Sequence, residues 1–397
     1  MRGLMQITRL VFAILIFLSI TYGVHYLLYT SFIRFFLISD PVIKKVLFWG
    51  MLFLTLSFLP SAILLRMNNN ILTSIYYIIA STWIGLAVYL IFSAVVIWII
   101  FLAGKMIGTI PDMRMISLVC VTIACLTTAY GIWRAQYPEI KNVDVKIERL
   151  PSVWQGKTVV QLSDVHLGSI NRTGFMKRIA EKVNSVNPDL ILITGDLFDG
   201  MGGDLPSFIE PLNALKASKG IFFVTGNHEG YLKLTEPVSI IRKTNIRILD
   251  NEIVDIDGLQ IVGISFPEHN FKNHVRTMFA TSAVFDPARP NILMYHTPTN
   301  ISDQYNNRAE QQTQTYWHPD TSTSLAKEMG IDLQLSGHTH NGQFFPFNLV
   351  THYIYNGFDY GLHKDGSFQI YISRGVGTWG PPMRVGCPPE IVVITLR

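Results

Sequence analysis

Cysteine is scarce in this chain, with three among 397 residues. Cys120 and Cys125 lie within one long apolar run, whereas Cys387 stands alone in the more polar part that follows. A disulfide needs two cysteines, so none can form within that polar part. The cysteines therefore give no information about the side of a membrane on which this part would lie.

Acidic residues are nearly absent from the first 140 residues, which carry three (Asp40, Asp112 and Glu139) against nine Lys and Arg. Of the 32 basic and 28 acidic residues in the chain, 23 and 25 lie downstream, so the excess positive charge belongs to the first part. A nucleic-acid-binding protein concentrates positive charge on its binding domain. The nearly neutral downstream part therefore argues against nucleic acid as a main partner.

Long apolar runs make up most of the first part. A helix crosses the hydrocarbon core with about 20 apolar residues, and Tyr and Trp near several run ends suit the membrane interface. One run could be a cleaved signal peptide, but three more with almost no internal charge are not explained that way. We therefore expect residues 1–135 to form an all-α transmembrane region of about four helices in the cell membrane. The four runs are Ile7–Tyr29, Val46–Leu65, Ile75–Ala103 and Ile116–Trp133.

Charge does not orient these spans. Four spans place both ends of the region on the same side, and the basic residues then number five on each side. The positive-inside rule therefore gives no preference. Ionisable residues inside spans mark transport pathways, and His25 is the one clear candidate. That scarcity argues against a transporter with a regulatory soluble domain.

The downstream part alternates between strand and helix patterns. Residues 136–145 are expected to be a linker and residues 146–397 a separate domain. Helical spacing over Arg172–Val186 and Pro206–Ala217 separates the first three strands, which is typical of an α/β core with parallel strands. The fourth to sixth strands are expected to be antiparallel. The expected strands are Lys157–Ser163, Leu190–Thr194, Ile221–Thr225, Ile246–Asp250, Ile253–Ile256, Gln260–Ile264, Ile292–Tyr295, Asp332–Ser336, Phe368–Ile372 and Ile391–Leu396.

Five short polar blocks follow strands of this domain. In open α/β sheets the loops at the carboxyl ends of strands converge on one edge, so blocks far apart in sequence can meet there. Gly195 would allow a tight turn that aims the next carboxylate. The blocks are Asp164-Val165-His166, Gly195-Asp196-Leu197-Phe198-Asp199, Gly226-Asn227-His228-Glu229, His296 and Gly337-His338-Thr339-His340.

Together the blocks supply imidazoles, carboxylates and one amide oxygen, without a thiolate. Such a set suits Mn²⁺, Fe or Zn²⁺ better than Ca²⁺ or a cysteine-type zinc site. A carboxylate has two oxygens and can bridge two cations. Two cations about 3.5–4 Å apart can activate water, orient a phosphoryl group and neutralise developing charge. Each block alone is weak evidence, but the whole set predicts a dinuclear metal site.

The set resembles the pattern of the calcineurin-like metallophosphoesterases, which runs D-x-H, G-D-x-x-D, G-N-H-[DE], H and G-H-x-H. The resemblance covers roughly residues 140–397 and implies an α/β fold, a two-sheet β-sandwich flanked by helices. It also implies two divalent metal ions at sites that share one aspartate. One site would hold Asp164, His166, Asp196 and His340, and the other Asp196, Asn227, His296 and His338.

The resemblance gives His228 a different role, as the proton donor to the leaving oxygen. Asp199 would orient its imidazole. A histidine that titrates near neutral pH suits general-acid work. Glu229 completes the block and is interpreted as structural. The catalytic pair predicted from the sequence is therefore His228 and Asp199.

The carboxyl-terminal run is the cue to a subgroup. Ser373–Gly377 and the residues up to Glu390 resemble membrane-associated bacterial metallophosphoesterases, which are related to UDP-diacylglucosamine pyrophosphatases. Arg374 or Arg384 could contact phosphate, and a structural salt bridge is an equal alternative.

Two departures from the family pattern prevent a transfer of substrate choice. Asn341 stands where relatives often have glycine, and Pro298–Pro319 is a long polar insertion, either a lid or a solvated loop.

The sequence thus predicts an integral membrane hydrolase of phosphoesters. Because an anchor holds the site near headgroups, a phospholipid, lipid-linked or nucleotide–lipid phosphoester is the favoured substrate. We favour the extracytoplasmic side for the domain because some relatives are exported. The alternative is a non-catalytic metal-binding sensor or regulatory module, which predicts loss of a ligand or of His228, and the sequence keeps them all. Four spans exceed what tethering requires, which hints at a partner or a lipid groove, and the identity of a protein partner is unknown.

Overall fold

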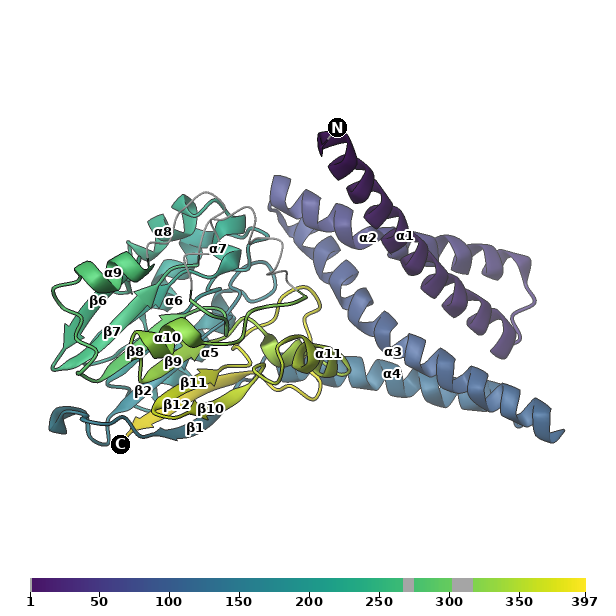
Figure 1. Cartoon of the computed structure of the whole chain (residues 1–397). Helices are drawn as coiled ribbons and strands as arrows, with labels where there is room; N and C mark the ends of the chain where they lie inside the picture. The colour runs from purple at the N-terminus through teal and green to yellow at the C-terminus, as the bar shows by residue number, and fades with distance from the viewer. Residues whose placement is uncertain (1, 267–274, 302–316) are drawn as a thin grey trace. The chain divides into compact units, whose positions relative to one another are not determined.

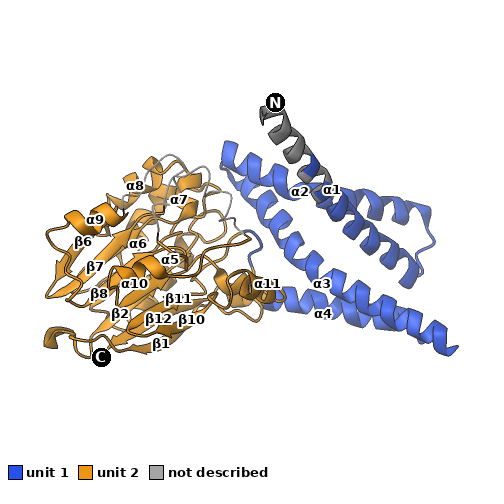
Figure 2. Cartoon of the chain, viewed as in Figure 1, with its two compact units in different colours: residues 1–130, 380–382 blue, residues 131–379, 383–397 orange. Residues whose placement is uncertain are grey.

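The computed structural model describes residues 2–266, 275–301 and 317–397. It divides into two compact units, coloured separately in Figure 2: residues 1–130 with 380–382, and residues 131–379 with 383–397. We call them the helical unit and the sheet unit. Figure 1 labels their elements.

The helical unit is built from long apolar helices. The side chain of Asp40 accepts a hydrogen bond from the N–H of Val42 at 2.7 Å and so caps the start of the second helix. Gly108 ends the third helix with a left-handed φ of 81°. The last turn of the fourth helix, residues 131–135, belongs to the sheet unit. The helices are α1 (Arg2–Phe35), α2 (Pro41–Met67), α3 (Ile71–Ile107) and α4 (Met113–Ala135).

Within the described residues, three helices are long and apolar enough to cross a membrane: α2, α3 and α4. Four spans were expected from the sequence, and the first of them is not among these three. The first expected span, Ile7–Tyr29, lies inside α1, but most side chains before Ser19 lie outside the described part of the chain. A crossing by α1 therefore stays a prediction, while α2–α4 support membrane association.

Both ring nitrogens of His25, the ionisable residue expected inside a span, make contacts within the helical unit. Its Nδ1 lies 2.8 Å from the carbonyl oxygen of Thr21, and its Nε2 lies 2.8 Å from the indole Nε1 of Trp83. A carbonyl accepts and an indole N–H donates, so the ring holds one proton, on Nδ1. This structural pairing of α1 with α3 leaves His25 no ring nitrogen for a transport role.

Two six-stranded sheets form the sheet unit (Figure 1). The first has the order β1-β12-β2-β3-β4-β5 and the second β10-β11-β9-β8-β7-β6. Neighbours run parallel from β2 to β5, and again from β7 through β8 and β9 to β11. The first sheet contains β1 (Glu139–Val145), β2 (Thr158–Leu162), β3 (Leu190–Thr194), β4 (Ile221–Val224), β5 (Arg247–Ile248) and β12 (Glu390–Leu396). The second contains β6 (Glu252–Ile256), β7 (Leu259–Ile264), β8 (Asn291–Tyr295), β9 (Leu333–Ser336), β10 (Gly361–Asp365) and β11 (Phe368–Ile372).

Strand β3 shows why these strands are apolar throughout. Leu190 and Leu192 join the core between the two sheets, whereas Ile191 and Ile193 point the other way, into the core under the outer helices. A strand covered on both faces needs apolar residues at every position. The other short elements are η1 (Ser152–Trp154), η2 (Leu205–Phe208), η4 (His340–Gly342), α5 (Thr173–Asn184), α6 (Ile209–Asn213), α7 (Asn227–Tyr231), α8 (Thr235–Ile241), α9 (Val275–Thr281), α10 (Ser324–Glu328) and α11 (Phe347–Ile354).

The two-sheet fold with flanking helices is confirmed, but three local expectations differ. The segment 136–145, expected to be a linker, contains strand β1, which pairs in parallel with β12. The strand expected over Ile246–Asp250 shortens to β5 and pairs in parallel with β4, because it extends the first sheet at its edge. The helix expected over Pro206–Ala217 shortens to η2 and α6.

Strand β10 and the short helices α8, α9, α10 and α11 were not predicted from the sequence. Most of the insertion Pro298–Pro319 lies outside the described residues.

Candidate metal centre

The polar blocks all follow the carboxyl ends of parallel strands. Strands β2, β3 and β4 lead into the first three blocks, and β8 and β9 lead into the last two. Parallel strands bring their carboxyl ends to one edge of a sheet, and here both sheets present that edge to the same place. The blocks therefore meet although the first and last are separated by more than 170 residues in sequence.

Most of the predicted ligands have a left-handed backbone. Non-glycine residues avoid this region because the Cβ meets the backbone carbonyl, and such positions cluster at functional sites. Asn341 shares this conformation, with φ of 48°, which explains why asparagine can stand at a position suited to glycine. The left-handed ligands are Asp164, His166, Asp196, His338 and His340, with φ between 50° and 71°.

Two glycines allow the blocks to approach closely. A Cβ on Gly337 would lie 1.9 Å from Ser163 Oγ and 2.1 Å from Asp164 Oδ2. A Cβ on Gly226 would lie 2.2 Å from Asp196 Oδ1. Any side chain at either position would push a carboxylate out of the site, so both glycines are required by packing.

The first cluster joins Asp164, His166 and His340, whose ligand atoms lie within 4.8 Å of one another. The two Nε2 atoms of the histidines are 3.0 Å apart, and His340 Nε2 is 3.3 Å from Asp164 Oδ1. All three side chains are buried.

The second cluster joins Asp196, His296 and His338. His296 Nε2 lies 3.1 Å from Asp196 Oδ2, 3.1 Å from the amide oxygen of Asn227 and 3.3 Å from His338 Nδ1. The Nδ1 of His296 lies 2.9 Å from the carbonyl oxygen of Thr194, so Nδ1 carries a proton and Nε2 is directed at the cluster.

Asp196 lies between the two clusters. Its Oδ2 atom is 3.1 Å from His296 Nε2 in the second cluster and 3.8 Å from His166 Nε2 beside the first. Its Oδ1 atom accepts a hydrogen bond from the backbone N–H of His228 at 2.9 Å. A single carboxylate thus faces both clusters, which is the position that a bridging ligand occupies.

The residues fit bound cations on chemical grounds. The Nε2 atoms of His166 and His340 are 3.0 Å apart, a distance at which a proton or a cation lies between them. Among the described residues, Nδ1 of His166 and both carboxylate oxygens of Asp199 are buried without a hydrogen-bond partner. Buried polar atoms without partners are uncommon in proteins. Nitrogen and oxygen ligand atoms that lie this close together are suited to binding divalent metals.

The pKa values of the histidines also fit a site that binds cations. Burial would lower the pKa of His296, but the carboxylate of Asp196 outweighs it and raises that pKa to about 9. Burial lowers the pKa of His338 to about 3 and also lowers the pKa values of His166 and His340. Neutral imidazoles bind metals, so three of the four rings are already in the required form. At His296 a proton takes the place that a cation would fill.

His228 lies beside the clusters rather than in the second one. Its Nε2 is 3.9 Å from Asp196 Oδ2, and its ring packs edge-on against that of His166 with centroids 4.5 Å apart. Burial would lower the pKa of His228, but the carboxylates of Asp196 and Asp199 raise it above its ordinary value. The residue could also complete a cation site with His166 and Asp196, so its geometry allows either role.

The contact between Asp199 and His228 differs from the expected one. Nδ1 of His228 hydrogen-bonds to the backbone carbonyl of Asp199, at 2.5 Å, and not to its carboxylate. The carboxylate instead lies 3.6 Å from Nδ1 of His166. Burial raises the pKa of Asp199 to about 7. Asp199 therefore orients His228 through its main-chain carbonyl. A substitution of the Asp199 side chain would retain this hydrogen bond.

Glu229 has the structural role expected of it. Its carboxylate accepts hydrogen bonds from the backbone N–H groups of Gly226 at 2.7 Å, Phe198 at 3.0 Å and Asp196 at 3.1 Å. These bonds tie the second block to the third. Burial raises the pKa of Glu229 to about 7.

Three residues that support the ligands were missed or undervalued by sequence reasoning. Ser163, interpreted as a strand end, donates to Asp164 Oδ2 at 2.5 Å. Thr339 donates to the carbonyl oxygen of Asp359 at 2.6 Å and so anchors the loop between His338 and His340. Arg384 lies against His340, although nothing in the sequence links these two positions.

Arg374 does not point to a phosphate site. Its guanidinium pairs with Glu390 at 2.8 Å and with Glu139 at 3.0 Å, and it stacks over the ring of Tyr360 at 4.4 Å. Tyr371 also donates to Glu390, at 3.1 Å. Of the two alternatives left open by the sequence, Arg374 forms the structural salt bridge.

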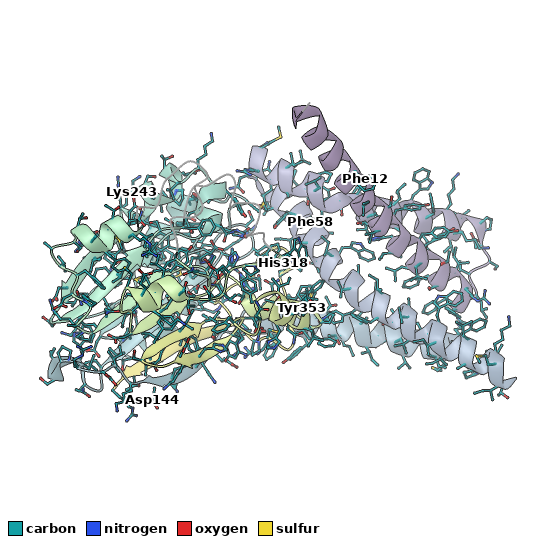
Figure 3. The ribbon with its side chains drawn as sticks, viewed as in Figure 1. Phe12, Phe58, Asp144, Lys243, His318 and Tyr353 are labelled. Carbon is teal, nitrogen blue, oxygen red and sulfur yellow. The ribbon has the colours of Figure 1, made fainter. Side chains whose placement is uncertain are left out.

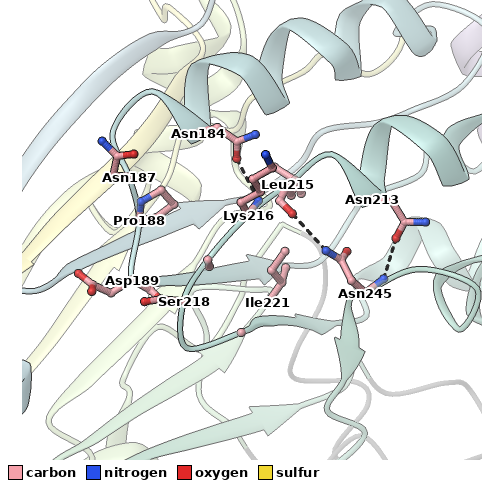
Figure 4. Close-up of a pocket in the computed structure, with 12 residues that line it drawn as sticks. Asn184, Asn187, Pro188, Asp189, Asn213, Leu215, Lys216, Ser218, Ile221 and Asn245 are labelled. Carbon is pink, nitrogen blue, oxygen red and sulfur yellow. Dashed lines mark hydrogen bonds between the residues drawn. The ribbon is translucent and has the colours of Figure 1, made fainter.

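The hollow drawn in Figure 4 lies at the opposite ends of the strands from the clusters. Residues just before β3 and β4, such as Asp189 and Gly220, line it. Its lining holds one carboxylate and no histidine or cysteine. Asn213 Oδ1 accepts from the N–H of Asn245 at 2.8 Å, and such bonds fasten neighbouring loops. This hollow therefore has no part in the metal chemistry.

Comparisons with known proteins agree with this centre. The calcineurin-like phosphoesterase family matches residues 157–342, which include every predicted ligand. The chain is similar to an uncharacterized metallophosphoesterase of Campylobacter jejuni, with 33% identity over 66% of this chain and 63% of the relative. It is similar to a transmembrane protein with metallophosphoesterase domain of Bos taurus, with 30% identity over 74% of this chain and 66% of the relative. The chain thus spans just under two thirds of the length of these relatives.

Among solved structures, the chain is similar to the NAD nucleotidase of Haemophilus influenzae. The identity is 12% over 55% of this chain and 50% of that chain, with a TM-score of 0.30. A likeness at this level bears on neither substrate nor mechanism.

Proposed function

Residues 157–342 belong to the calcineurin-like phosphoesterase family, and on that premise we propose that the chain is a membrane-anchored hydrolase of phosphoesters that works with two divalent cations. The position of Asp196 between two clusters of ligands is the observation that carries the proposal. Asp164, His166, Asp196 and His340 would hold one cation. Asp196, Asn227, His296 and His338 would hold the other.

The bound cations would supply Lewis-acid stabilisation of charge on a phosphoryl group. The protein residues around them bind, orient and transfer protons. Thr194 pairs with Val224 at the end of β3, and its carbonyl oxygen, 2.9 Å from Nδ1, fixes the ring of His296. The backbone N–H of His338 donates to both carboxylate oxygens of Asp164, at 3.1 and 3.0 Å, and so holds that carboxylate in position.

His228 would protonate the leaving oxygen of the substrate. Its Nδ1–H is held by the Asp199 carbonyl, which leaves Nε2 directed toward the clusters. Its pKa lies above the ordinary value, because the neighbouring carboxylates outweigh burial. A ring that holds its proton near neutral pH can donate it when the phosphorus–oxygen bond breaks.

The favoured substrates are lipid or nucleotide–lipid phosphoesters, as in the UDP-diacylglucosamine pyrophosphatases that the carboxyl-terminal run resembles. The membrane helices support this choice, since they keep the centre near a bilayer. We also propose that the sheet unit lies on the extracytoplasmic side. A non-catalytic sensor would tolerate loss of His228 or of a ligand, and the chain retains all of them.

The test is a screen of the full chain in detergent with Mn²⁺ against phosphomonoesters, phosphodiesters and dispersed phospholipids. We expect hydrolysis that a chelator abolishes and that Mn²⁺ restores. Stoichiometric metal binding without turnover of any substrate class would instead favour the sensor.

A further inference from the structure

Helix α11 carries its apolar stripe on the outside of the sheet unit. Leu349, Val350 and Tyr353 recur at the spacing of one helical face, and they are 59%, 45% and 83% exposed. We call these three residues the α11 stripe. A surface helix of a soluble domain normally turns such a stripe inward. Helix α5 does so, with Phe175, Met176 and others of its apolar positions buried. The outward stripe of α11 therefore requires an apolar partner.

Two contacts tie α11 to the loop that carries the ligand candidates His338 and His340. His352 Nδ1 lies 2.9 Å from the carboxylate of Asp359, whose carbonyl oxygen accepts the hydroxyl of Thr339 at 2.6 Å. Thr339 separates the ligands His338 and His340. The stripe thus lies on a helix tied to the loop of His338 and His340, and whatever covers it lies near that loop.

Hydrogen bonds connect α11 to the end of a membrane span. The N–H of Phe345, two residues before α11, donates to Val385 O at 2.9 Å. The N–H of the adjoining Arg384 donates to Gly131 O, also at 2.9 Å. Gly131 lies in the last turn of the span α4, within the sheet unit.

Near this end of α4, Trp133 and Tyr137 are 57% and 52% exposed, and their ring centroids are 5.6 Å apart. Aromatic residues of this kind favour the bilayer interface.

From these contacts we propose that α11 is an interfacial helix whose stripe enters the bilayer that α4 crosses. The α11 stripe thus contacts a lipid surface. Helix α11 has no Asp, Glu, Lys or Arg, so its insertion depends on apolar area and not on anionic headgroups. The inserted helix presents the edge of the metal centre to molecules embedded in the membrane. This deepens the proposed function by giving an amphiphilic phosphoester a direct approach, but the binding of α11 to lipid does not depend on turnover.

The test measures lipid contact directly. The three cysteines are replaced by serine in the full chain, and one new cysteine carries an environment-sensitive fluorophore, in Tyr353→Cys or, as a control, in Lys243→Cys. Figure 3 labels both positions, and they lie far apart on the sheet unit. The protein is placed in phosphatidylcholine nanodiscs with or without phosphatidylcholine spin-labelled near the headgroup.

We expect the label at 353 to be quenched several-fold more strongly than the label at 243. Val350→Glu should reduce that quenching to the control level. Val153→Glu is its match, since Val153 is 43% exposed on η1 against 45% for Val350, and it should leave quenching unchanged. Replacing a third of the lipid by phosphatidylglycerol, or raising salt, should change little. Gel filtration and thermal unfolding check that each variant is folded.

Three results would overturn the proposal. A label at 353 in a water-like environment means that the stripe is uncovered. A shielded label that spin-labelled lipid does not quench means that protein covers it, either the chain's own helices or a second copy. Quenching that requires anionic lipid means that charge, and not the stripe, drives the contact. Because no readout involves hydrolysis, an inactive protein would contradict the proposed function and leave this inference intact.

Discussion

Arg384 holds the ligand candidate His340 by two contacts. Its Nη1 donates to the carbonyl oxygen of His340 at 3.0 Å, and its Nη2 lies 2.9 Å from Nδ1 of the ring. A guanidinium only donates, so Nδ1 accepts and Nε2 is turned toward Asp164 Oδ1, 3.3 Å away. Burial lowers the pKa of Arg384 to about 10, which keeps it charged at neutral pH.

Arg384→Lys should weaken the cation site that contains His340. A lysine has no planar fork to hold the carbonyl and the ring together. Loss of a partner that orients a metal ligand typically lowers metal affinity by about 10–100-fold. Titration of the metal-free full chain with Mn²⁺, followed by electron paramagnetic resonance, measures this change. Arg374→Lys is the matched control, because Arg374 is buried against Glu390 and touches no candidate ligand. Equal losses of affinity in both variants would mean that Arg384 acts only through general stability.

Asp196→Ala should empty both cation sites, because its carboxylate faces both clusters. Asn227→Ala should mainly weaken one, since its amide oxygen lies 3.1 Å from His296 Nε2 in the second cluster alone. Elemental analysis of the purified variants gives the occupancy of each. Nearly full occupancy by two cations in Asp196→Ala would rule out a bridging role.

His228→Ala should keep both cations yet slow hydrolysis. Loss of a positioned general acid costs about 10²–10⁴-fold in rate. The loss should shrink for aryl phosphates, whose leaving groups need little protonation. A variant that loses a cation, or that cleaves good and poor leaving groups with equal impairment, would make His228 a ligand or a phosphate-binding group.

Asp199→Asn tests the main-chain contact described above. Because the carbonyl of Asp199 holds His228, the variant should retain the dependence on leaving group and lose much less rate than His228→Ala. The remaining effect should come from a smaller rise in the pKa of His228, to which the Asp199 carboxylate contributes, and from His166, whose Nδ1 lies 3.6 Å from that carboxylate. A loss as large as that of His228→Ala would show that the carboxylate itself takes part.

Asp189→Asn should lower stability at neutral pH but not in acid. Burial would raise the pKa of Asp189, but the N–H of Thr158 at 2.9 Å and the ammonium of Lys157 at 3.1 Å lower it below its ordinary value. A carboxyl group whose pKa is lower in the folded state than in the unfolded state stabilises the fold at pH values above its unfolded pKa of about 4. This stabilisation is lost as the pH falls through the pKa of the folded state. We expect a difference of about 1 kcal/mol at pH 7 that vanishes in acid, measured by thermal unfolding in detergent. Asp257→Asn, at an exposed ion pair, should show almost no difference at either pH.

Membrane orientation can be read from cysteine labelling in intact cells. With the native cysteines replaced, Asn142→Cys should react with an impermeant maleimide before lysis if the sheet unit is extracytoplasmic. Asn69→Cys, between α2 and α3, should behave in the same way, and Asp112→Cys, between α3 and α4, in the opposite way. Reaction at residue 142 only after lysis would place the unit in the cytoplasm.

The ends of the core strands could be predicted because buried parallel strands are apolar at every position. The prediction for Leu190–Thr194 matches β3 throughout. The block that follows β3 contains both the glycine that makes the turn and the carboxylates predicted to bind metal. Strand β1 could not be predicted in this way. Its residues Lys141 and Asn142 are exposed, and they form a strand only because β12 supplies hydrogen bonds from about 250 positions further along.

The residues that hold the ligand candidates in place could not be predicted from the sequence either. Arg384 lies 44 residues from His340, and a buried guanidinium is recognised only once its acceptors are placed around it. The carboxylate of Asp199 was expected at His228 because the two positions are paired in the family pattern. Its direction depends on a backbone turn that a motif does not encode. Helix α11 was missed because its apolar residues face outward, where no core explains them.

Strand β12 is the last strand in the described part of the chain, and it lies between β1 and β2. During synthesis the ribosome therefore releases the membrane helices and nearly all of the sheet unit before the strand that joins β1 to the rest exists. Pairing across so long a separation is slow to form. Until then β1, which follows α4 directly, has both of its edges unpaired, whereas in the folded sheet β12 covers one of them. A strand with unpaired edges can pair with another chain, so we expect the risk of aggregation to be greatest before β12 is made.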